Sequence, residues 1–568
     1  MVVLVGLCAA FMTSLAWATA SPVGSSPDED AHITYAWGVA TGQVLPWNAV
    51  ESEGANGAQL VQVVIPAEIK ERPAEECYMF QSTEPACADL AEDPEAGTIL
   101  STTYMARYPQ LYYAAMGAVM RVGLELGFGG LVVLVAARVF SGLMSLALIG
   151  WGTTMLARRF GTLPALVPAL VTATPMLFFL SSSINPNGFE VASAIAVASG
   201  VVSVRFDAAR EMTSTRGTTW GLGVAAVCLA FARPASIVWL VLLLIVLVLP
   251  FRGRGVLSGV RGVGGAFTTA LALIALAGLA WFAYQNGTRS GGSADQDLSA
   301  WTEIKPLFRF FMVVLRFGPM LHEGYGLLGW LDTPLPLLFF LVWLMVSLVV
   351  LTRMLSQPGN DVLHLGWAAL FLAACVLAVG VQSNLSAFGW QGRYFLPALF
   401  AFVVLTVPAI AGGDSPRPDR RWSVATLLVV VVGLDLSALV FNLFRYLYGL
   451  TDLYTRFNPL PIPAPGGEWN PVIGRFTPFV IGALGALLLV VILVPAILRG
   501  NDRVGIEGSS GMCAANRSDV SGTGSVLGGD PPDDSGTFGG VAARGPEPRG
   551  VPEGESSPQA RADNEPRR

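Results

Sequence analysis

A short stretch near the start of the chain gathers the side chains best suited to acid–base chemistry. Asp28, Glu29 and Asp30 are consecutive carboxylates, and His32 follows two positions later in a chain with only 3 histidines. A carboxylate can take a proton from a hydroxyl group or hold a divalent cation. The sequence therefore predicts a catalytic centre made by Asp28, Glu29 and His32, with a divalent cation as a candidate cofactor.

The local structure of this stretch has two interpretations. If a helix begins at Pro27, whose fixed φ suits a first turn, then Asp28, His32 and Tyr35 share one face and Glu29 points elsewhere. The alternative is that the acidic residues only complement the dipole at the start of a helix. The sequence leaves both open.

Residues that could bind a charged substrate lie farther along the chain. Gln391, Arg393 and Tyr394 stand at the start of an apolar run, and an arginine fork matches phosphate oxygens well. An interfacial belt of aromatic and arginine side chains is the alternative for this motif. Arg138 and Asp435 lie inside apolar runs, where charges usually face the protein interior. We expect these two to contact a charged substrate or each other, or to form a structural polar pair between helices.

Three further polar motifs have simpler explanations. Asn185-Pro186-Asn187 is typical of a turn that caps a helix. Arg233, where two apolar runs meet, could reach the membrane surface with its long side chain. His322-Glu323, beside a glycine-rich turn, is expected to be solvated.

Composition identifies the chain as an integral membrane protein. Hydrophobic residues make up 53% of it and the mean hydropathy is +0.58, with repeated apolar runs of membrane-spanning length. The 34 basic residues include only two lysines, Lys70 and Lys305, and form no run that predicts a nucleic-acid partner. No P-loop, GxGxxG, HExxH or paired CxxC motif is present, so ATP-driven transport and dinucleotide chemistry have no support.

The apolar runs predict an all-α polytopic fold with about twelve transmembrane helices. Residues 1–20 form the first, because no basic residues precede it as they would in a signal peptide. The others are predicted at 131–157, 163–181, 186–204, 219–232, 235–250, 264–285, 334–352, 362–382, 393–411, 422–442 and 476–498.

The polar segments between these runs define the remaining organisation. Residues 21–127 form a large loop with interfacial helices and a short strand at Gln59–Pro66, where apolar and polar residues partly alternate. Cys77 and Cys87 in this loop are expected to form a disulfide, the alternative being two free thiols. Residues 128–498 form the helix bundle, with outer loops at 286–333, containing an amphipathic interfacial helix, and at 443–475. Residues 499–568 are predicted to be a disordered tail.

Arginine placement predicts the orientation in the membrane. The arginines of the short loops all fall on one side of the alternating topology, which marks that side as cytoplasmic. Both termini are then cytoplasmic, and the large first loop with Asp28 is extracytoplasmic.

Several motifs in this order resemble a bacterial membrane family known as domain of unknown function 2142. They are Pro27-Asp28-Glu29 with His32, Tyr108-Pro109 with Tyr112-Tyr113, Arg138 with Ser141, Asn185-Pro186-Asn187, and Gln391-Gly392-Arg393-Tyr394-Phe395-Leu396-Pro397. That family in turn resembles the GT-C superfamily of integral membrane glycosyltransferases, which use polyprenyl-phosphate sugars and keep an acidic motif in the first outer loop.

The resemblance implies a GT-C-like fold and assigns roles to individual residues. Asp28 would be the catalytic acid/base or a metal carboxylate, supported by Glu29 and oriented by His32. Arg107 and Arg393 would bind the lipid phosphate. The chain has Asn187 where the family is expected to have Asp, and Tyr108-Pro109-Gln110 where Pro-Pro is usual, which weakens any role for these two turns.

Three functions remain open from the sequence. The first is a GT-C glycosyltransferase at the outer face of the bacterial cytoplasmic membrane, moving sugar from a polyprenyl-phosphate donor to an envelope glycan, lipid or protein acceptor. The second is a non-enzymatic transporter or flippase of lipid-linked intermediates, with Arg138 and Asp435 along its path. The third is an assembly scaffold that binds through its tail. For the first, the predicted substrate-binding residues are Arg107, Tyr112, Arg138, Gln391, Arg393 and Tyr394.

Overall fold

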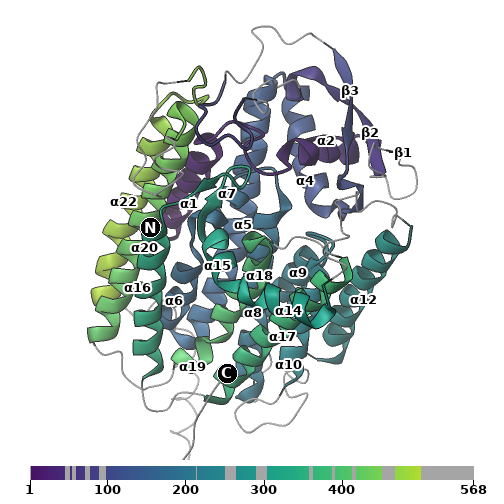
Figure 1. Cartoon of the computed structure of the whole chain (residues 1–568). Coiled ribbons are helices and arrows are strands. Elements are labelled where there is room, and N and C mark those ends of the chain that lie inside the picture. Colours follow the sequence, from purple (N-terminus) through teal and green to yellow (C-terminus); the bar gives the residue numbers. More distant parts are fainter. Residues whose placement is uncertain are drawn as a thin grey trace, which may run out of the picture. The chain divides into compact units, whose positions relative to one another are not determined.

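The computed structural model describes residues 2–44, 51–53, 59–70, 77–87, 97–210, 212, 214–249, 264–288, 304–356, 362–386, 391–411, 418–450 and 467–499. These residues form many helices and two small antiparallel sheets (Figure 1). The tail that the sequence predicts to be disordered lies outside the described residues, apart from residue 499.

Eight helices of the described residues are long and apolar enough to cross a membrane, which confirms the all-α polytopic fold. A ninth span results if α6 (Thr162–Thr172) and α7 (Pro175–Ser181), bent by 75° at the break between them, are taken together. The other three predicted spans fall on α1 (Val2–Thr19), α9 (Arg216–Ala230) and α10 (Ser236–Val248), which do not pass the same test over the described residues. The eight are α5 (Gly130–Phe160), α8 (Pro186–Ala209), α12 (Gly265–Thr288), α16 (Leu337–Leu355), α17 (Val362–Ser386), α18 (Gly392–Leu405) continued by α19 (Val407–Ile410), α20 (Pro418–Tyr448) and α22 (Thr477–Arg499).

Helix α8 is the central helix of the bundle, and the apolar window that marks it as a span is entirely buried. Its sequence is rich in Ala, Ser, Gly and Val, and small residues let neighbouring helices approach closely. It packs against α5, α18 and α9. As predicted, a turn caps its start, where the Asn185 side chain accepts a hydrogen bond from the backbone N–H of Asn187 at 3.0 Å.

A three-stranded sheet and two helices cover one end of the bundle (Figure 1). Strand β2 (Gln59–Pro66), which the sequence predicts, pairs with β1 (Glu51–Glu53) and β3 (Thr98–Thr103). Its Val61, Val63 and Ile65 are buried while Val64 is exposed, as the two-residue period of a strand requires. The buried face packs on α2 (Glu29–Ala40), which packs on α4 (Gln110–Glu125).

A disulfide closes residues 77–87 of the first loop, and a buried arginine attaches this segment to the helix bundle. Cys77 and Cys87 are joined, with their Cα atoms 6.1 Å apart. Arg445, near the end of α20, is fully buried and donates to the backbone oxygens of Tyr78 and Glu84. Arg445 therefore links this turn of the loop to α20, more than 350 positions later in the chain.

The amphipathic helix expected after Trp301 is present as α14 (Pro306–Leu315). It buries none of its residues and exposes Leu307, Phe308 and Leu315, as an interfacial helix would. The chain continues through α15 (Phe317–Gly326) and the short pair β4 (Leu327–Leu328) and β5 (Thr333–Pro334).

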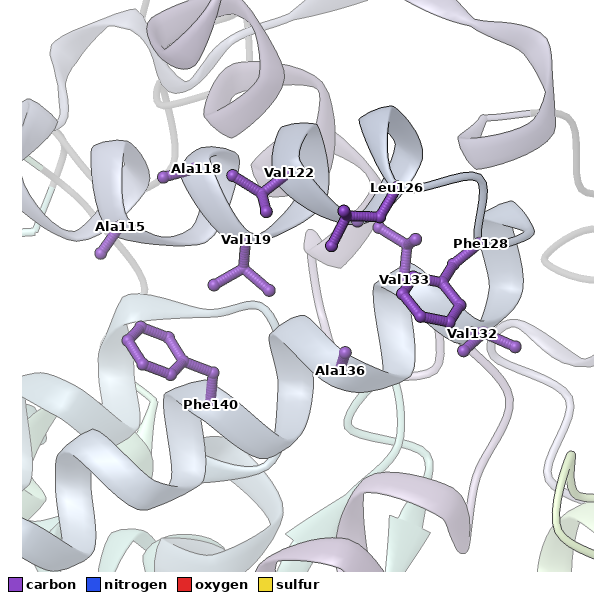
Figure 2. Close-up of a pocket in the computed structure, with 11 residues that line it drawn as sticks. Ala115, Ala118, Val119, Val122, Leu126, Phe128, Val132, Val133, Ala136 and Phe140 are labelled. Carbon is purple, nitrogen blue, oxygen red and sulfur yellow. The ribbon is translucent and has the colours of Figure 1, made fainter.

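Helices α4 and α5 enclose an apolar groove of about 610 Å³. Figure 2 shows the two helices joined near Phe128, with Val119 and Phe140 facing the space between them. All its lining residues are Ala, Val, Gly, Leu or Phe, and Leu126 and Phe128 are more than half exposed. Such a surface suits a hydrocarbon environment.

Candidate functional site

Asp28 precedes α2 rather than standing inside it. The helix begins at Glu29, and Asp28 is its N-cap residue with φ 64° and ψ 9°. The expectation of a helix beginning at Pro27 is therefore wrong, although the Asp28 carbonyl still accepts the backbone N–H of His32 at 3.0 Å. A left-handed φ is uncommon for a residue other than glycine and persists only where the surroundings impose it.

The residues that surround the Asp28 turn include a buried ion pair between Glu29 and Arg138. Arg138 Nη2 lies 2.5 Å from Glu29 Oε2 and its Nε lies 2.8 Å from Oε1, with both side chains almost completely buried. The backbone N–H groups of Gly24 and Ile184 donate to the same carboxylate. Burial disfavours the ionised form, but the Arg138 charge and these hydrogen bonds outweigh it, so the pKa of Glu29 is lowered.

The remaining donors of Arg138 bind the chain just before Asp28. They contact the carbonyl oxygens of Ala18, Ser21 and Pro22 at 2.7–3.0 Å. This is the structural polar pair that the sequence left as an alternative, and its acidic member is Glu29 instead of Asp435. Glu29 and Arg138, predicted as catalytic and substrate-binding residues, are both enclosed by protein next to the Asp28 turn.

The Asp28 side chain is about one third exposed and meets two residues from distant parts of the chain. Its Oδ1 accepts a hydrogen bond from the Tyr104 hydroxyl at 2.6 Å. Its Oδ2 lies 3.9 Å from Arg393 Nη2, in the first turn of α18. Burial raises the pKa of Tyr104, and the negative charge of Asp28 raises it further. The Tyr104 hydroxyl therefore stays protonated and donates to Asp28. The two motifs at the ends of the resemblance therefore converge.

Arg393 is a buried cation whose hydrogen-bonding capacity is largely unused. Its side chain is 3% exposed, and its Nη2 donates to the Tyr394 hydroxyl at 3.1 Å. Its Nε and Nη1 are buried without a hydrogen-bond partner among the described residues. Unsatisfied buried donors are costly and call for an explanation. An anion bound beside Asp28 would satisfy them.

A second guanidinium faces the same tyrosine. Arg233 lies over the Tyr394 ring at 4.6 Å, and Arg393 lies 5.1 Å from the centre of that ring. Arg233 is held by Glu190 at 3.1 Å, and Ser236 donates to the other oxygen of that carboxylate at 2.7 Å. The simple explanation of Arg233 as a residue reaching the membrane surface is therefore wrong. Its side chain is 12% exposed and belongs to a polar network that brings a second positive charge to this region.

A polar cavity of about 340 Å³ adjoins Arg393. It is lined by Gln391, Glu323 and Arg316 together with apolar residues. Gln391 Oε1 is buried without a partner among the described residues, and Glu323 accepts the backbone N–H of Gly392 at 3.2 Å. The volume falls within the range of small-molecule sites. Glu323, expected to be only solvated, instead caps the helix that carries Arg393.

Helix α15 can bring Glu323 this close only because residue 392 is a glycine. A Cβ at Gly392 would lie 2.1 Å from the Met320 oxygen and 2.4 Å from the Gly324 nitrogen. The wall of the cavity therefore depends on backbone-to-backbone packing between α15 and α18.

His32 is buried in a cluster of tyrosines. Its Nδ1 lies 2.8 Å from the Tyr113 hydroxyl, and its ring packs edge-on against Tyr108. Burial lowers its pKa to about 4, despite the opposing effect of Asp28, so the ring is neutral at pH 7. No described hydrogen bond joins the imidazole to the Asp28 carboxylate, so orientation of that carboxylate by the His32 ring has no support in the geometry.

The other predicted binding residues lie around this cluster. The Tyr112 hydroxyl is buried 2.9 Å from Ser141 Oγ, and this contact joins α4 to α5, the two helices that line the apolar groove. Arg107 is half-buried in the short helix η2 (Met105–Arg107), and Asp30 pairs with Lys70. Within the described parts of the chain, no group of three or more His, Cys, Asp and Glu residues could hold a metal ion.

The sequence does not predict the roles of three residues that contribute to the candidate site. The sequence alone indicates no role for Tyr104 or Glu190, and it predicts that Arg233 reaches the membrane surface. A charged residue followed by proline between two apolar runs was the available signal for Arg233. Its partner could not be inferred, because the two residues are 43 positions apart.

With this geometry described, the chain can be placed among known proteins. The family described as "Predicted membrane protein (DUF2142)" matches residues 11–401, more than half of the chain. The protein therefore belongs to this family of membrane proteins. A search of curated proteins found no match.

One solved structure is similar over most of its length. The crystal structure of ArnT from Cupriavidus metallidurans bound to undecaprenyl phosphate matches 88% of this chain and 77% of its own, with 15% identity and a TM-score of 0.40.

Proposed function

We propose that the protein is a GT-C-type glycosyltransferase that takes a sugar from a polyprenyl-phosphate donor. The observation that carries the proposal is the buried Arg393 guanidinium, with two unpartnered nitrogen atoms, 3.9 Å from the partly exposed carboxylate of Asp28. A phosphate leaving group needs a cation with free donors, and an acceptor hydroxyl needs a base. Arg393 and Asp28 supply the cation and the base at one place in the structure.

In the proposed reaction the acceptor hydroxyl oxygen forms a bond to the anomeric carbon of the sugar. Asp28 takes the hydroxyl proton, and the bond between the anomeric carbon and the phosphate oxygen breaks. The phosphate leaves with that electron pair, and Arg393 stabilises its charge. Tyr104 holds the other oxygen of Asp28, and Arg233 adds positive charge behind Tyr394.

Two features favour a lipid substrate on the extracytoplasmic side. The apolar groove lies between α4 and α5, the helices that the Tyr112–Ser141 contact joins, and offers a surface for a hydrocarbon chain (Figure 2). Helices α5 and α8 begin near Asp28 and end together at the Arg159–Asp207 ion pair. The arginine-rich end predicted to be cytoplasmic is thus opposite the site, which favours the outer face of the bacterial cytoplasmic membrane, with both termini cytoplasmic.

The transporter alternative loses its predicted path. It required Arg138 and Asp435 to line one route, whereas Arg138 is enclosed with Glu29 and Asp435 lies beside Trp17.

The test compares two neighbouring carboxylates. Membranes containing Asp28→Asn or Asp30→Asn protein are incubated with a panel of radiolabelled polyprenyl-phosphate sugars, and transfer to envelope material is measured. We expect Asp28→Asn to lose about 10²–10⁴-fold in rate, as for removal of a general base. Asp30 faces Lys70 instead of Arg393, so its variant should transfer at close to the normal rate. Undiminished transfer by Asp28→Asn would overturn the proposal.

A further inference from the structure

Asp435 lies near the middle of α20 and opens onto a cavity of about 220 Å³, whose lining does not include Asp28 or Arg393. Five helices contribute to the wall, namely α1, α6, α7, α20 and α22. Figure 1 shows α1, α20 and α22 side by side at one edge of the bundle. Apart from Thr13, Trp17 and Asp435, every lining residue is apolar.

Only one oxygen of the Asp435 carboxyl group has a hydrogen-bond partner among the described residues. Its Oδ2 accepts the indole N–H of Trp17 at 3.5 Å, the outer limit of a hydrogen bond. Its Oδ1 is buried and has no partner in the described part of the chain. An ionisable side chain inside a membrane is expensive and usually serves a function.

The space in front of this oxygen is large enough for part of an organic molecule. An engineered apolar cavity of about 150 Å³ holds a benzene molecule, so 220 Å³ accommodates a short length of hydrocarbon chain. Residues on both sides of the 75° break between α6 and α7, including Ala173 and Phe178, line the cavity. The cavity therefore adjoins the break between these two helices.

The polar groups present define the head group that fits. Asp435 Oδ1 requires a donor, and the Thr13 hydroxyl can donate to one acceptor atom, whereas the Trp17 N–H already donates to Asp435 Oδ2. A hydroxyl group supplies one donor and one acceptor. An ammonium group brings three donors and no acceptor, so it could pair with Asp435 but would leave the Thr13 hydroxyl proton without an acceptor.

We propose that this cavity binds the hydroxyl end of a lipid alcohol, an apolar chain with a single alcohol head group, through Asp435. The site is independent of the proposed glycosyl transfer, because none of its lining residues belongs to the Asp28–Arg393 region.

The test is photolabelling of the full-length protein in lipid nanodiscs. The probe is a long-chain primary alcohol with a diazirine beside its hydroxyl end, compared with the same chain carrying no head group and with the corresponding amine. Labelled peptides are identified by mass spectrometry. We expect the alcohol to label α1, α20 or α22 about tenfold more than the bare hydrocarbon does, the change that one hydrogen bond supports.

Two variants at one position separate recognition from folding. Asp435→Asn keeps an acceptor oxygen and should retain labelling, whereas Asp435→Leu removes it and should lose about tenfold. Ala486→Leu, which fills the cavity from α22, should lose labelling with Asp435 intact. Circular dichroism confirms that each variant is folded. Equal labelling of the wild type and Asp435→Leu, or stronger labelling by the amine or the bare hydrocarbon, would overturn the proposal.

Discussion

Replacing Glu29 with glutamine tests the claim that a buried ion pair shapes the Asp28 turn. The carboxylate is completely buried, and Arg138 contacts both of its oxygens at 2.5 and 2.8 Å. Glu29→Gln leaves the guanidinium buried without a counter-charge, and removing one partner of a buried pair costs about 3–5 kcal/mol. We expect the free energy of unfolding, measured by denaturant titration of the purified protein in detergent, to fall by that amount.

Two comparisons make this prediction specific. Glu125→Gln removes an exposed partner of Arg121 four residues away, and such pairs contribute about 0.3–0.5 kcal/mol. Replacing both Glu29 and Arg138 with methionine removes both buried charges, so the double variant should be more stable than Glu29→Gln.

The pH dependence follows from the lowered pKa of Glu29. The stabilisation is fully present above the ordinary value of 4.5 and is lost as the pH falls through the lower value of the folded protein. The reasoning is refuted if Glu29→Gln unfolds with the same free energy as the wild type. It is also refuted if the double variant is less stable than the single one.

Three further predictions address the site. The folded protein keeps His32 neutral until about pH 4, whereas the unfolded chain protonates it near 6.5, so about 3 kcal/mol of stability should be lost as the pH falls between these values; a pH series of unfolding free energies should show this loss in the wild type and not in His32→Gln, and equal losses in both would contradict it. Arg393→Lys replaces a planar fork with a point charge, so sugar transfer should fall about tenfold or more, with a raised KM for the phosphate-linked donor; unchanged steady-state kinetics would exclude Arg393 from donor binding. Gly392→Ala places a Cβ 2.1 Å from the Met320 oxygen, so overpacking should lower the unfolding free energy by about 1–3 kcal/mol, and a wild-type value would show that the α15–α18 contact is looser than described.

Features that depend on neighbouring residues could be predicted from the sequence alone. The strand Gln59–Pro66 has the predicted bounds, because alternation of apolar and polar side chains is a local pattern. The cap at Asn185 was recognisable because a short polar side chain before proline suits the start of a helix. Span positions followed from runs of apolar residues for the same reason.

Features that depend on which helices meet were decided only by the tertiary structure. Arg138 was recognised as a buried charge, but its partner is Glu29, 109 positions earlier, and not Asp435. Asp28 and Arg393 were both singled out, yet only the tertiary structure places them 3.9 Å apart with Tyr104 and Arg233 around them. The physical reason is that hydropathy along the chain shows that a charge must be compensated, whereas the three-dimensional packing of distant segments determines which group compensates it.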